Sequence, residues 1–257
     1  MELKYYELKA FIAASGIFFD PIAKLQRSVV NVFVKGDGKE IQFSAPSSDQ
    51  TLQLNGTIDF PGFDKAACFG QLPFIRGILE SNYLKDDYNL EVDYITTKTG
   101  KEFIRSFDIT SKRTKINYRF SDPTLPNIIK PRILNDLVWL YSFNSDKQLL
   151  AEFNEAKKLN GLSGLKEPVF EIVFNGEDVE FQFGTGGSNT IDLKPTITDL
   201  EINDGSPCGV KIDTDNFMTG LGFAAEGGRI SISHKALKFE FVKNDMFFEL
   251  VIYAKKD

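Results

Sequence analysis

The chain has 257 residues, of which 42% are hydrophobic and 26% are charged, so it is a folded chain with room for one large domain or two ordinary ones. Its formal net charge of −6 argues against a uniformly basic nucleic-acid binder, because phosphate contacts need Lys and Arg. Any contact with DNA must therefore depend on how the charges are distributed. The 24 phenylalanines favour β-sheet cores.

The two cysteines, Cys68 and Cys208, are too few for a disulfide framework in a chain of this length. They predict reduced thiols and a cytoplasmic protein. Residues 1–15 lack a long apolar core behind a basic start, so no secretory signal is expected there. No apolar run approaches the roughly 18 residues that span a bilayer, so no membrane association is expected.

The first half of the chain predicts a helix, several strands, a short helix and three more strands. The first helix covers residues 3–14, ends at Ser15-Gly16 and precedes an ambiguous stretch, 16–27. The short helix covers 71–82, with Pro73 in its first turn. Alternating apolar residues and turn glycines predict the strands, which are residues 28–36, 39–46, 50–60, 64–70, 89–97, 101–110 and 114–120.

Residues 121–132 carry three prolines, which exclude a helix and an inner strand because each fixes φ and removes a hydrogen-bond donor. This segment predicts an extended connector. It separates a first domain, 1–120, from a second domain, 133–257.

The same order of elements recurs after the connector. A helix is predicted at 145–161, with Ser145 as its cap, Leu149, Leu150, Phe153 and Ala156 on its apolar face, and Gly161 as its stop. A second, short helix is predicted at 214–225. The strands predicted around these helices are residues 137–144, 168–176, 178–186, 189–202, 208–213, 229–234, 236–243 and 246–256.

The two short helices share a pattern: Phe74-Ile75-Arg76-Gly77-Ile78 resembles Phe217-Met218-Thr219-Gly220-Leu221. The same shift along the chain places the first helix on the helix at 145–161. The sequence therefore predicts two duplicated domains, each with antiparallel sheets and two helices, in an α+β fold. A glycine inside each short helix costs about 1 kcal/mol relative to alanine and predicts close packing against a helix or sheet.

No residue pattern predicts catalysis or a metal site. The only histidine, His234, follows a predicted strand and is expected at the surface. Residues 213–216 resemble the start of a calcium loop but lack its later Gly and Glu, so a helix cap is expected. The glycine-rich stretch 184–187 lies between strands, whereas a phosphate cradle needs a helix behind it. Neither a cofactor nor an enzyme activity is expected.

Several segments resemble T4-type bacteriophage DNA sliding clamps. They are LKAFIAASGI and LPFIRGILES in the two helices, YRFSDPTLPNIIKP at the connector, and the closing DNFMTGLGFAAEGGRISI and ALKFEFVKNDMFFELVIYA. The resemblance implies a DNA-clamp fold and a homotrimeric ring, an accessory protein that holds a DNA polymerase on double-stranded DNA and is opened by a clamp loader. It places the protein in the cytoplasm of the infected host cell. Twelve helices about 8–10 Å apart would enclose a hole on the order of 32–38 Å wide.

The resemblance also directs attention to two sets of side chains. Lys9 lies in the stretch that is similar to a pore helix of the family, and helix placement adds the other candidate contacts to DNA phosphates, Lys4, Arg76, Lys147, Lys157 and Lys158. Carboxylates on the same helices predict a weakly positive lining. Partner peptides with apolar anchors are expected to contact the connector or the last strand, at Leu125, Ile128, Ile129, Phe247, Val251 and Tyr253. The alternative is a duplicated β-rich phage structural or scaffold protein that does not slide on DNA.

Overall fold

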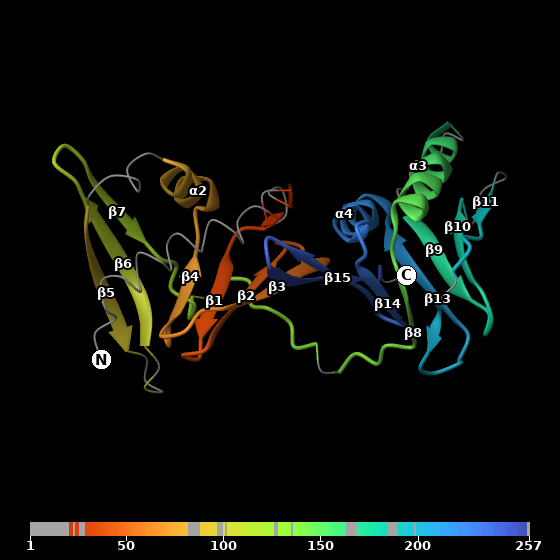
Figure 1. Ribbon diagram of the computed structural model, residues 1–257, viewed down its shortest axis with the longest axis horizontal. Coiled ribbons are helices and arrows are strands. Elements are labelled where there is room, and N and C mark those ends of the chain that lie inside the picture. The colour runs from red at the N-terminus through yellow and green to blue at the C-terminus, as the bar shows by residue number, and fades with distance from the viewer. Residues whose placement is uncertain are drawn as a thin grey trace. The chain divides into compact units, whose positions relative to one another are not determined.

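The computed structural model of the chain describes residues 21–22, 24–25, 29–81, 88–96, 100, 102–125, 128–134, 136–162, 169–184, 190–197 and 199–255. It contains two compact units (Figure 1). Unit 1 comprises Met1–Arg132 with Asn244–Met246, and unit 2 comprises Ile133–Lys243 with Phe247–Asp257. The predicted first helix, 3–14, lies outside the described residues, and so do Lys4 and Lys9.

Unit 1 consists of seven described strands and one described helix. The strands are β1 (Val32–Gly36), β2 (Glu40–Pro46), β3 (Leu52–Asp59), β4 (Ala66–Phe69), β5 (Asn89–Thr96), β6 (Glu102–Thr110) and β7 (Lys115–Arg119). The helix is α2 (Leu72–Glu80). The strands run in the order β3-β2-β1-β4-β6-β5, with β7 on β6. Neighbouring strands are antiparallel except β4 and β6, which are parallel and share a single residue pair, Ala66 with Phe103.

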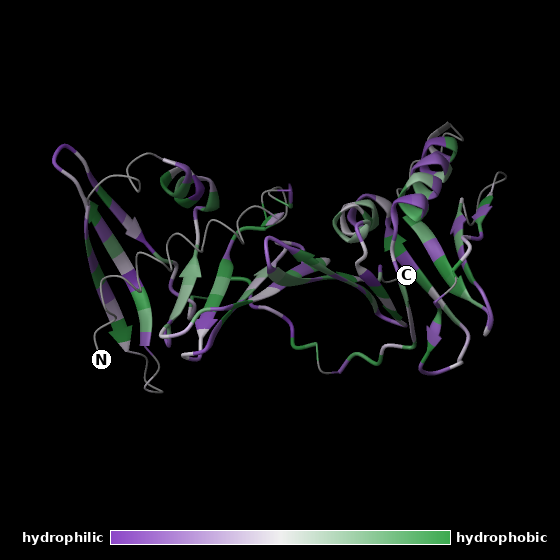
Figure 2. Cartoon of the chain, viewed as in Figure 1, coloured by the Kyte–Doolittle hydropathy of each residue, from purple (hydrophilic) through white to green (hydrophobic). Residues whose placement is uncertain are grey.

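The core of unit 1 lies on one face of this sheet, under α2. Strand alternation sends Val32 and Val34 to that face, where both are buried, and leaves Lys35 exposed on the other. Phe69, Phe107, Tyr118 and Phe120 are buried and form an aromatic cluster with ring centroids 4.9–6.3 Å apart. Figure 2 shows the resulting alternation of hydrophobic and hydrophilic segments along the strands.

Unit 2 consists of nine described strands and two described helices. The strands are β8 (Tyr141–Asn144), β9 (Val169–Phe174), β10 (Val179–Phe183), β11 (Ile191–Leu193), β12 (Glu201–Ile202), β13 (Cys208–Asp213), β14 (Arg229–Ser233), β15 (Ala236–Lys243) and β16 (Met246–Tyr253). The helices are α3 (Lys147–Leu162) and α4 (Thr214–Ala224). One sheet has the order β11-β10-β9-β13, and the other strands run β12-β8-β14-β15-β16.

Helices α3 and α4 lie side by side over these sheets (Figure 1). Phe153 on α3 and Phe217 on α4 are fully buried, with ring centroids 4.5 Å apart. Both rings also contact the sheet below, through Phe170 and Phe181. The predicted apolar face of α3 is confirmed, since Leu149, Phe153 and Ala156 are buried, although Leu150 is half-exposed.

The two units share one connectivity, which agrees with the duplication predicted from the sequence. In unit 1 the ladder β3-β2-β1-β4 is followed by α2 and then by β5, β6 and β7. In unit 2 the ladder β11-β10-β9-β13 is followed by α4 and then by β14, β15 and β16. In unit 1, β1 pairs with both β2 and β4, the strand before α2. In unit 2, β9 likewise pairs with both β10 and β13, the strand before α4. Such a match of pairing order carries more weight than the five-residue sequence match.

Helix caps show which local predictions were right. The Asp213 side chain accepts hydrogen bonds from the N–H groups of Asp215 and Asn216, so the expected cap of α4 is confirmed. The prediction that Ser145 caps α3 is wrong. Asp146 is the cap, because its carboxylate accepts a hydrogen bond from the N–H of Leu149 at 2.7 Å. Gly161 was predicted to stop α3, but the helix continues through Leu162.

Two predicted strands are shorter than expected. In place of the single strand predicted at 189–202, the described residues form β11, which ends at Leu193, and β12, which begins at Glu201. Pro195 lies between them and cannot donate a ladder hydrogen bond. The strand predicted at 137–144 begins only at Tyr141. Among the described residues, no helix has the length and apolarity needed to cross a bilayer.

The two helix glycines differ in their surroundings. A Cβ on Gly220 would come within 2.5 Å of the Phe239 ring, so the predicted close packing is confirmed there. A Cβ on Gly77 would meet nothing within 4 Å among the described residues, so the described part of the chain shows no close packing at this position of α2.

Gly77→Ala is therefore expected to raise the free energy of unfolding by up to about 1 kcal/mol, because alanine favours a helix interior. Gly220→Ala is expected to lower it, because the Phe239 ring must move. Urea denaturation of both variants measures the difference. A destabilised Gly77→Ala variant would contradict the open surroundings of Gly77.

Candidate nucleic-acid and partner interfaces

The described helices bring four of the predicted DNA contacts to the protein surface. Arg76 lies half-exposed on α2, and α3 carries Lys147, Lys157 and Lys158. Three of these cations pair with carboxylates: Arg76 with Glu80 at 2.6 Å, Lys147 with Glu226 at 3.2 Å, and Lys157 with Asp215 at 2.7 Å. Lys158 is exposed and has no ion pair among the described residues.

The charges on the described helices are balanced. The described helices carry as many carboxylates as cations, namely Glu80, Glu152, Glu155 and Asp215 against Arg76, Lys147, Lys157 and Lys158. The weakly positive lining predicted from the sequence stays a prediction, because Lys4 and Lys9 lie outside the described residues. Exposed ion pairs are weak and are screened by salt, so a phosphate can replace the carboxylate partner of Lys147.

The described end of the connector is fixed to unit 1 through its backbone. The buried Asn31 side chain donates a hydrogen bond to the Ile129 carbonyl at 3.1 Å. The buried Gln53 side chain accepts one from the N–H of Arg132 at 2.8 Å and donates one to its carbonyl at 3.3 Å. Because these bonds use backbone groups, they fix the path of the connector whatever its side chains are.

The three partner residues predicted on the connector differ in exposure. Leu125 is 46% exposed, whereas Ile128 and Ile129 are half-buried. Leu125 therefore offers the most apolar surface to a partner.

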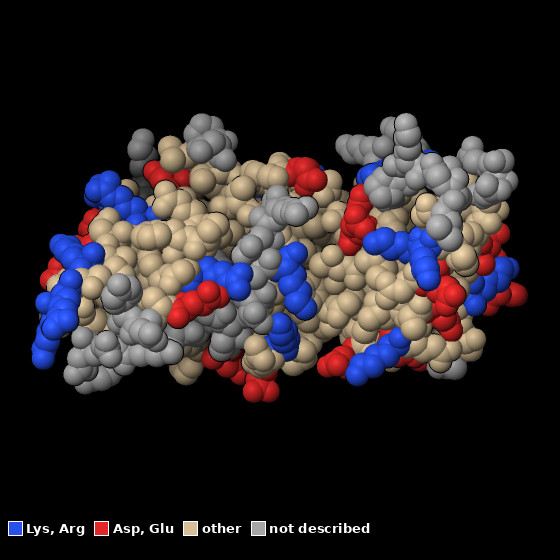
Figure 3. Space-filling view, turned by 90° about the horizontal axis from the view of Figure 1, so that it is seen from above, with Lys and Arg blue, Asp and Glu red and all other residues tan. Residues whose placement is uncertain are grey.

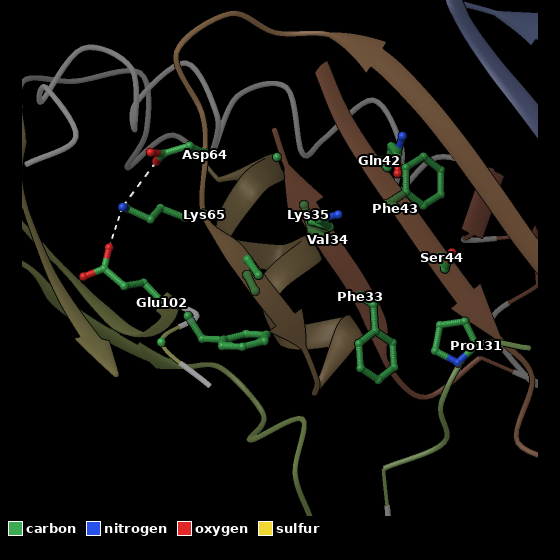
Figure 4. A pocket seen from close by; sticks show the side chains of 15 residues that line it. Phe33, Val34, Lys35, Gln42, Phe43, Ser44, Asp64, Lys65, Glu102 and Pro131 are labelled. Atoms are coloured by element: carbon green, nitrogen blue, oxygen red, sulfur yellow. Dashed lines mark hydrogen bonds and ion pairs between the residues drawn. The ribbon is translucent and has the colours of Figure 1, made fainter. Parts of the chain in front are cut away.

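A pocket of about 620 Å³ lies beside this segment in unit 1 (Figure 4). Strand register places its side chains on the sheet face opposite the core, since Lys35 pairs with Ala66 and Ala66 pairs with Phe103 in one row. Phe33 stands in the next row of the same face. Pro131 of the connector also borders the pocket (Figure 4).

The pocket exists because of two local features. Strands β4 and β6 share only one residue pair, so the sheet opens beyond it. Ala66 is small and half-buried, and it leaves a depression between the larger Phe33 and Phe103 side chains. A volume of this size can hold two or three side chains of a peptide.

Figure 4 shows Asp64, Lys65 and Glu102 joined to one another on one side of the pocket. The ammonium group of Lys65 is 2.5 Å from Glu102 and 3.3 Å from Asp64, and hydrogen bonding to Glu102 raises the pKa of Lys65. Lys35 is exposed and has no ion pair among the described residues. An apolar pocket with charged side chains beside it is suited to binding a peptide that has an apolar anchor.

The predicted partner residues of the last strand are divided between surface and core. Phe247 is 42% exposed and borders a second pocket, of about 360 Å³, with Phe223 and Phe241. Tyr253 is half-buried. Val251 is fully buried, so the prediction that it contacts a partner is wrong. The fully buried neighbours Phe248, Leu250 and Ile252 show that both faces of β16 are largely covered near its end.

The groups that could have carried catalysis are placed as expected. His234 is exposed in the turn between β14 and β15. Cys68 and Cys208 are free and buried, and burial raises the pKa of Cys68 to about 12, which keeps it protonated near neutral pH. In the part of the chain that the structure describes, no group of His, Cys, Asp and Glu is arranged to hold a metal ion.

Sequence reasoning missed the pocket of unit 1 entirely. Its walls come from strands far apart in the chain, and only the parallel neighbours β4 and β6 bring Ala66 beside Phe103. The single local signal is the small pair Ala66-Ala67 inside a strand, which by itself does not distinguish a pocket from tight packing.

The fold is that of the DNA clamps. The chain is similar to the beta chain of DNA polymerase III from Streptococcus pneumoniae, with 12% identity and a TM-score of 0.60, over 89% of this chain and 57% of that one. It is similar to PCNA from Thermococcus kodakaraensis, with 12% identity and a TM-score of 0.57, over 98% and 97% of the two chains. Proliferating cellular nuclear antigen from Entamoeba histolytica gives 12% identity, a TM-score of 0.52, and 94% and 96%.

These likenesses confirm the predicted fold class, α+β with the clamp architecture. The chain spans about 57% of the Streptococcus beta chain and nearly the whole of the PCNA chains. No family model matches the sequence, and no curated protein sequence matches it either.

Proposed function

We propose that the protein is a DNA sliding clamp of the T4 bacteriophage type, a homotrimeric ring that encircles double-stranded DNA and tethers a replicative DNA polymerase. The observation that carries the proposal is the duplicated connectivity of the two units, which matches PCNA along nearly the whole of both chains. The clamp acts without catalysis and needs a clamp loader to open it.

Ring closure follows from the edges of the sheets. A chain of two β-rich units has free strand edges on both, and head-to-tail pairing between the first unit of one copy and the second unit of the next satisfies them. Sedimentation at micromolar concentration is expected to give a trimer, and electron images are expected to show rings. A monomer, a stable dimer or a long fibre would contradict the clamp, and a fibre would favour a structural or scaffold protein.

DNA contact is proposed to be nonspecific and to use phosphates. The double variant Lys147→Ala/Lys158→Ala is expected to bind duplex DNA more weakly and to reduce the slope of log K against log salt by about 2 per chain, if both lysines contact phosphates. Titration of DNA at several salt concentrations measures the slope. Arg76, Lys157, Lys4 and Lys9 remain proposed phosphate contacts.

The matched control removes two exposed lysines that lie in turns, Lys39→Ala and Lys235→Ala. It carries the same change of net charge and is expected to keep the parent's salt dependence. Equal slopes for the two double variants would show that Lys147 and Lys158 do not contact DNA.

Partner peptides are proposed to dock beside the connector. The apolar anchor would enter the 620 Å³ pocket between Phe33 and Phe103, and Leu125 would add exposed apolar surface along the connector. The same site would serve the polymerase and the clamp loader in turn, since both must hold the ring.

A further inference from the structure

The pocket of unit 1 carries different charges on its two sides. The strand order β2-β1-β4-β6 places Lys35 of β1 on one side of Ala66 and Glu102 of β6 on the other. Figure 4 shows the same arrangement, with Lys35 apart from the group formed by Asp64, Lys65 and Glu102. A peptide that fills the pocket therefore meets two chemically distinct sides. Figure 3 shows positive and negative side chains interspersed in the same way over one face of the molecule.

The charges on the β6 side are already paired with one another. The ammonium group of Lys65 lies 2.5 Å from Glu102 and 3.3 Å from Asp64, and the Lys65 side chain is only 10% exposed. A ligand that broke these contacts would leave a largely buried ammonium group without a partner, which is costly. The second carboxylate leaves a residual negative charge on this side, so a cationic peptide is the competing ligand.

Lys35, on the β1 side, has no such partner. Its side chain is exposed, and it lines the pocket. Gln42 is opposite Lys35 on β2, and its amide donates a hydrogen bond to Glu40 at 2.6 Å, so Glu40 is bound to Gln42 instead of Lys35. Among the described residues that line the pocket, Lys35 is the charged side chain without an ion pair. It is thus available to a carboxylate of a ligand.

The connector adds a second cation close to this side. Lys130 is exposed and has no ion pair among the described residues. It stands between Ile129, whose carbonyl is held by Asn31, and Pro131, which borders the pocket. Figure 4 shows Pro131 on the same side of the pocket as Phe33. A peptide that lies along the connector would therefore meet positive charge from Lys130 as well.

We infer that the partner peptide carries a carboxylate close to its apolar anchor and that Lys35 selects this group. The inference rests on the proposed docking of a peptide in the pocket and adds the chemical class of that peptide. Lys35 is opposite Ala66 on the neighbouring strand, about 5 Å away, and an extended peptide advances about 3.3 Å per residue. The carboxylate therefore belongs about one or two residues from the anchor. A peptide that covers Lys35 also removes water from the ion pair, which strengthens it.

A library of random decapeptides supplies the probes for a test on the full chain. Peptides are selected on the parent protein, and those that also bind Ala66→Phe are discarded, because that substitution fills the pocket. The remaining peptides are expected to carry Asp or Glu beside an aromatic or aliphatic anchor. The same selection on Lys35→Glu is expected to yield Lys or Arg at that position.

A charge swap then measures the contact between Lys35 and the peptide. The strongest selected peptide is compared with a copy in which lysine replaces its acidic residue, and fluorescence anisotropy gives the affinity of both for the parent and for Lys35→Glu. Each single reversal is expected to weaken binding by about tenfold or more, because like charges then face each other. The two reversals together are expected to restore binding.

The matched control is Lys235→Glu, which makes the same change of net charge at an exposed position in a turn of unit 2 and does not line the pocket. It is expected to bind both peptides as the parent does, and circular dichroism checks that each variant is folded. Added salt is expected to weaken the acidic peptide on the parent more than a copy with the corresponding amide residue.

The outcomes separate the inference from the proposed function. If pocket-dependent peptides are found but bind the folded Lys35→Glu variant as they bind the parent, selection by Lys35 is wrong and the proposed docking stands. If these peptides carry Lys or Arg beside the anchor, the carboxylates of the β6 side select the ligand, and the inference is also wrong. If no peptide distinguishes the parent from Ala66→Phe, the docking itself fails, and the inference fails with it.

Discussion

Replacing Phe153 with alanine is expected to lower the free energy of unfolding by about 3–5 kcal/mol. Phe153 is fully buried, and its ring centroid lies 4.5–5.7 Å from those of four other phenylalanines, namely Phe170, Phe181, Phe183 and Phe217. Loss of the ring would leave a cavity bounded by α3, α4 and the sheet, which cannot collapse without moving the helices. Urea or thermal unfolding measures the loss.

The matched control for this prediction lies on the same helix. Leu159 is 49% exposed, so Leu159→Ala removes a large apolar side chain from α3 without opening a cavity. It is expected to change the free energy of unfolding by less than about 0.5 kcal/mol. Comparable losses in the two variants would mean that α3 is held by something other than its buried face.

The Phe153→Ala substitution is also expected to affect DNA binding. Lys147, Lys157 and Lys158 are placed by α3, and α3 is positioned by the Phe153 contacts with the sheet and with α4. A cavity at this point would let α3 and its lysines shift before the sheets unfold. DNA binding of Phe153→Ala is therefore expected to weaken below the temperature of global unfolding, whereas Leu159→Ala is expected to bind as the parent does.

Local patterns of the sequence predicted most elements but not all of their ends. The Asp213 cap follows from a few adjacent residues, and it is present in the structure. Ser145 and Asp146 are both good caps, and the sequence does not say which side chain faces the free N–H groups. In the structure Ser145 is buried and Asp146 makes the bond.

Tertiary contacts decided the remaining differences. Gly77 and Gly220 have the same local pattern, yet among the described residues only Gly220 faces a ring of another element. Both faces of β16 are apolar, so alternation could not show that Val251 is buried while Phe247 is exposed. The pocket at Ala66 has the same origin, because it is a product of strand order.

Ala66→Phe is expected to weaken binding of the proposed partner peptide, for which the C-terminal peptide of the polymerase is the probe, by at least about tenfold, which is 1.4 kcal/mol. The new ring would stand on the outer face of β4, in the row between Lys35 and Phe103, and would occupy the space proposed for the peptide anchor. Phenylalanine suits a strand, so the fold is expected to persist. Fluorescence anisotropy of a labelled peptide measures the affinity.

The control places the same ring on the same face outside the pocket. Thr57 on β3 is opposite Gln42, which is opposite Lys35, so Thr57 shares the row of Ala66 but does not line the pocket. Thr57→Phe is expected to bind the peptide like the parent. A second pair of changes, Leu125→Ser and Ile128→Ser, tests the connector itself and is expected to weaken binding as well.

The combined results locate the site. Loss of affinity in Ala66→Phe with an unchanged Thr57→Phe variant places the anchor in the pocket of unit 1, because only the filled space differs. If Ala66→Phe binds normally and the connector variant does not, the peptide contacts Leu125 and leaves the pocket empty. If all variants form trimers and bind the peptide as the parent does, the docking site lies on neither surface, and the junction between subunits becomes the place to search.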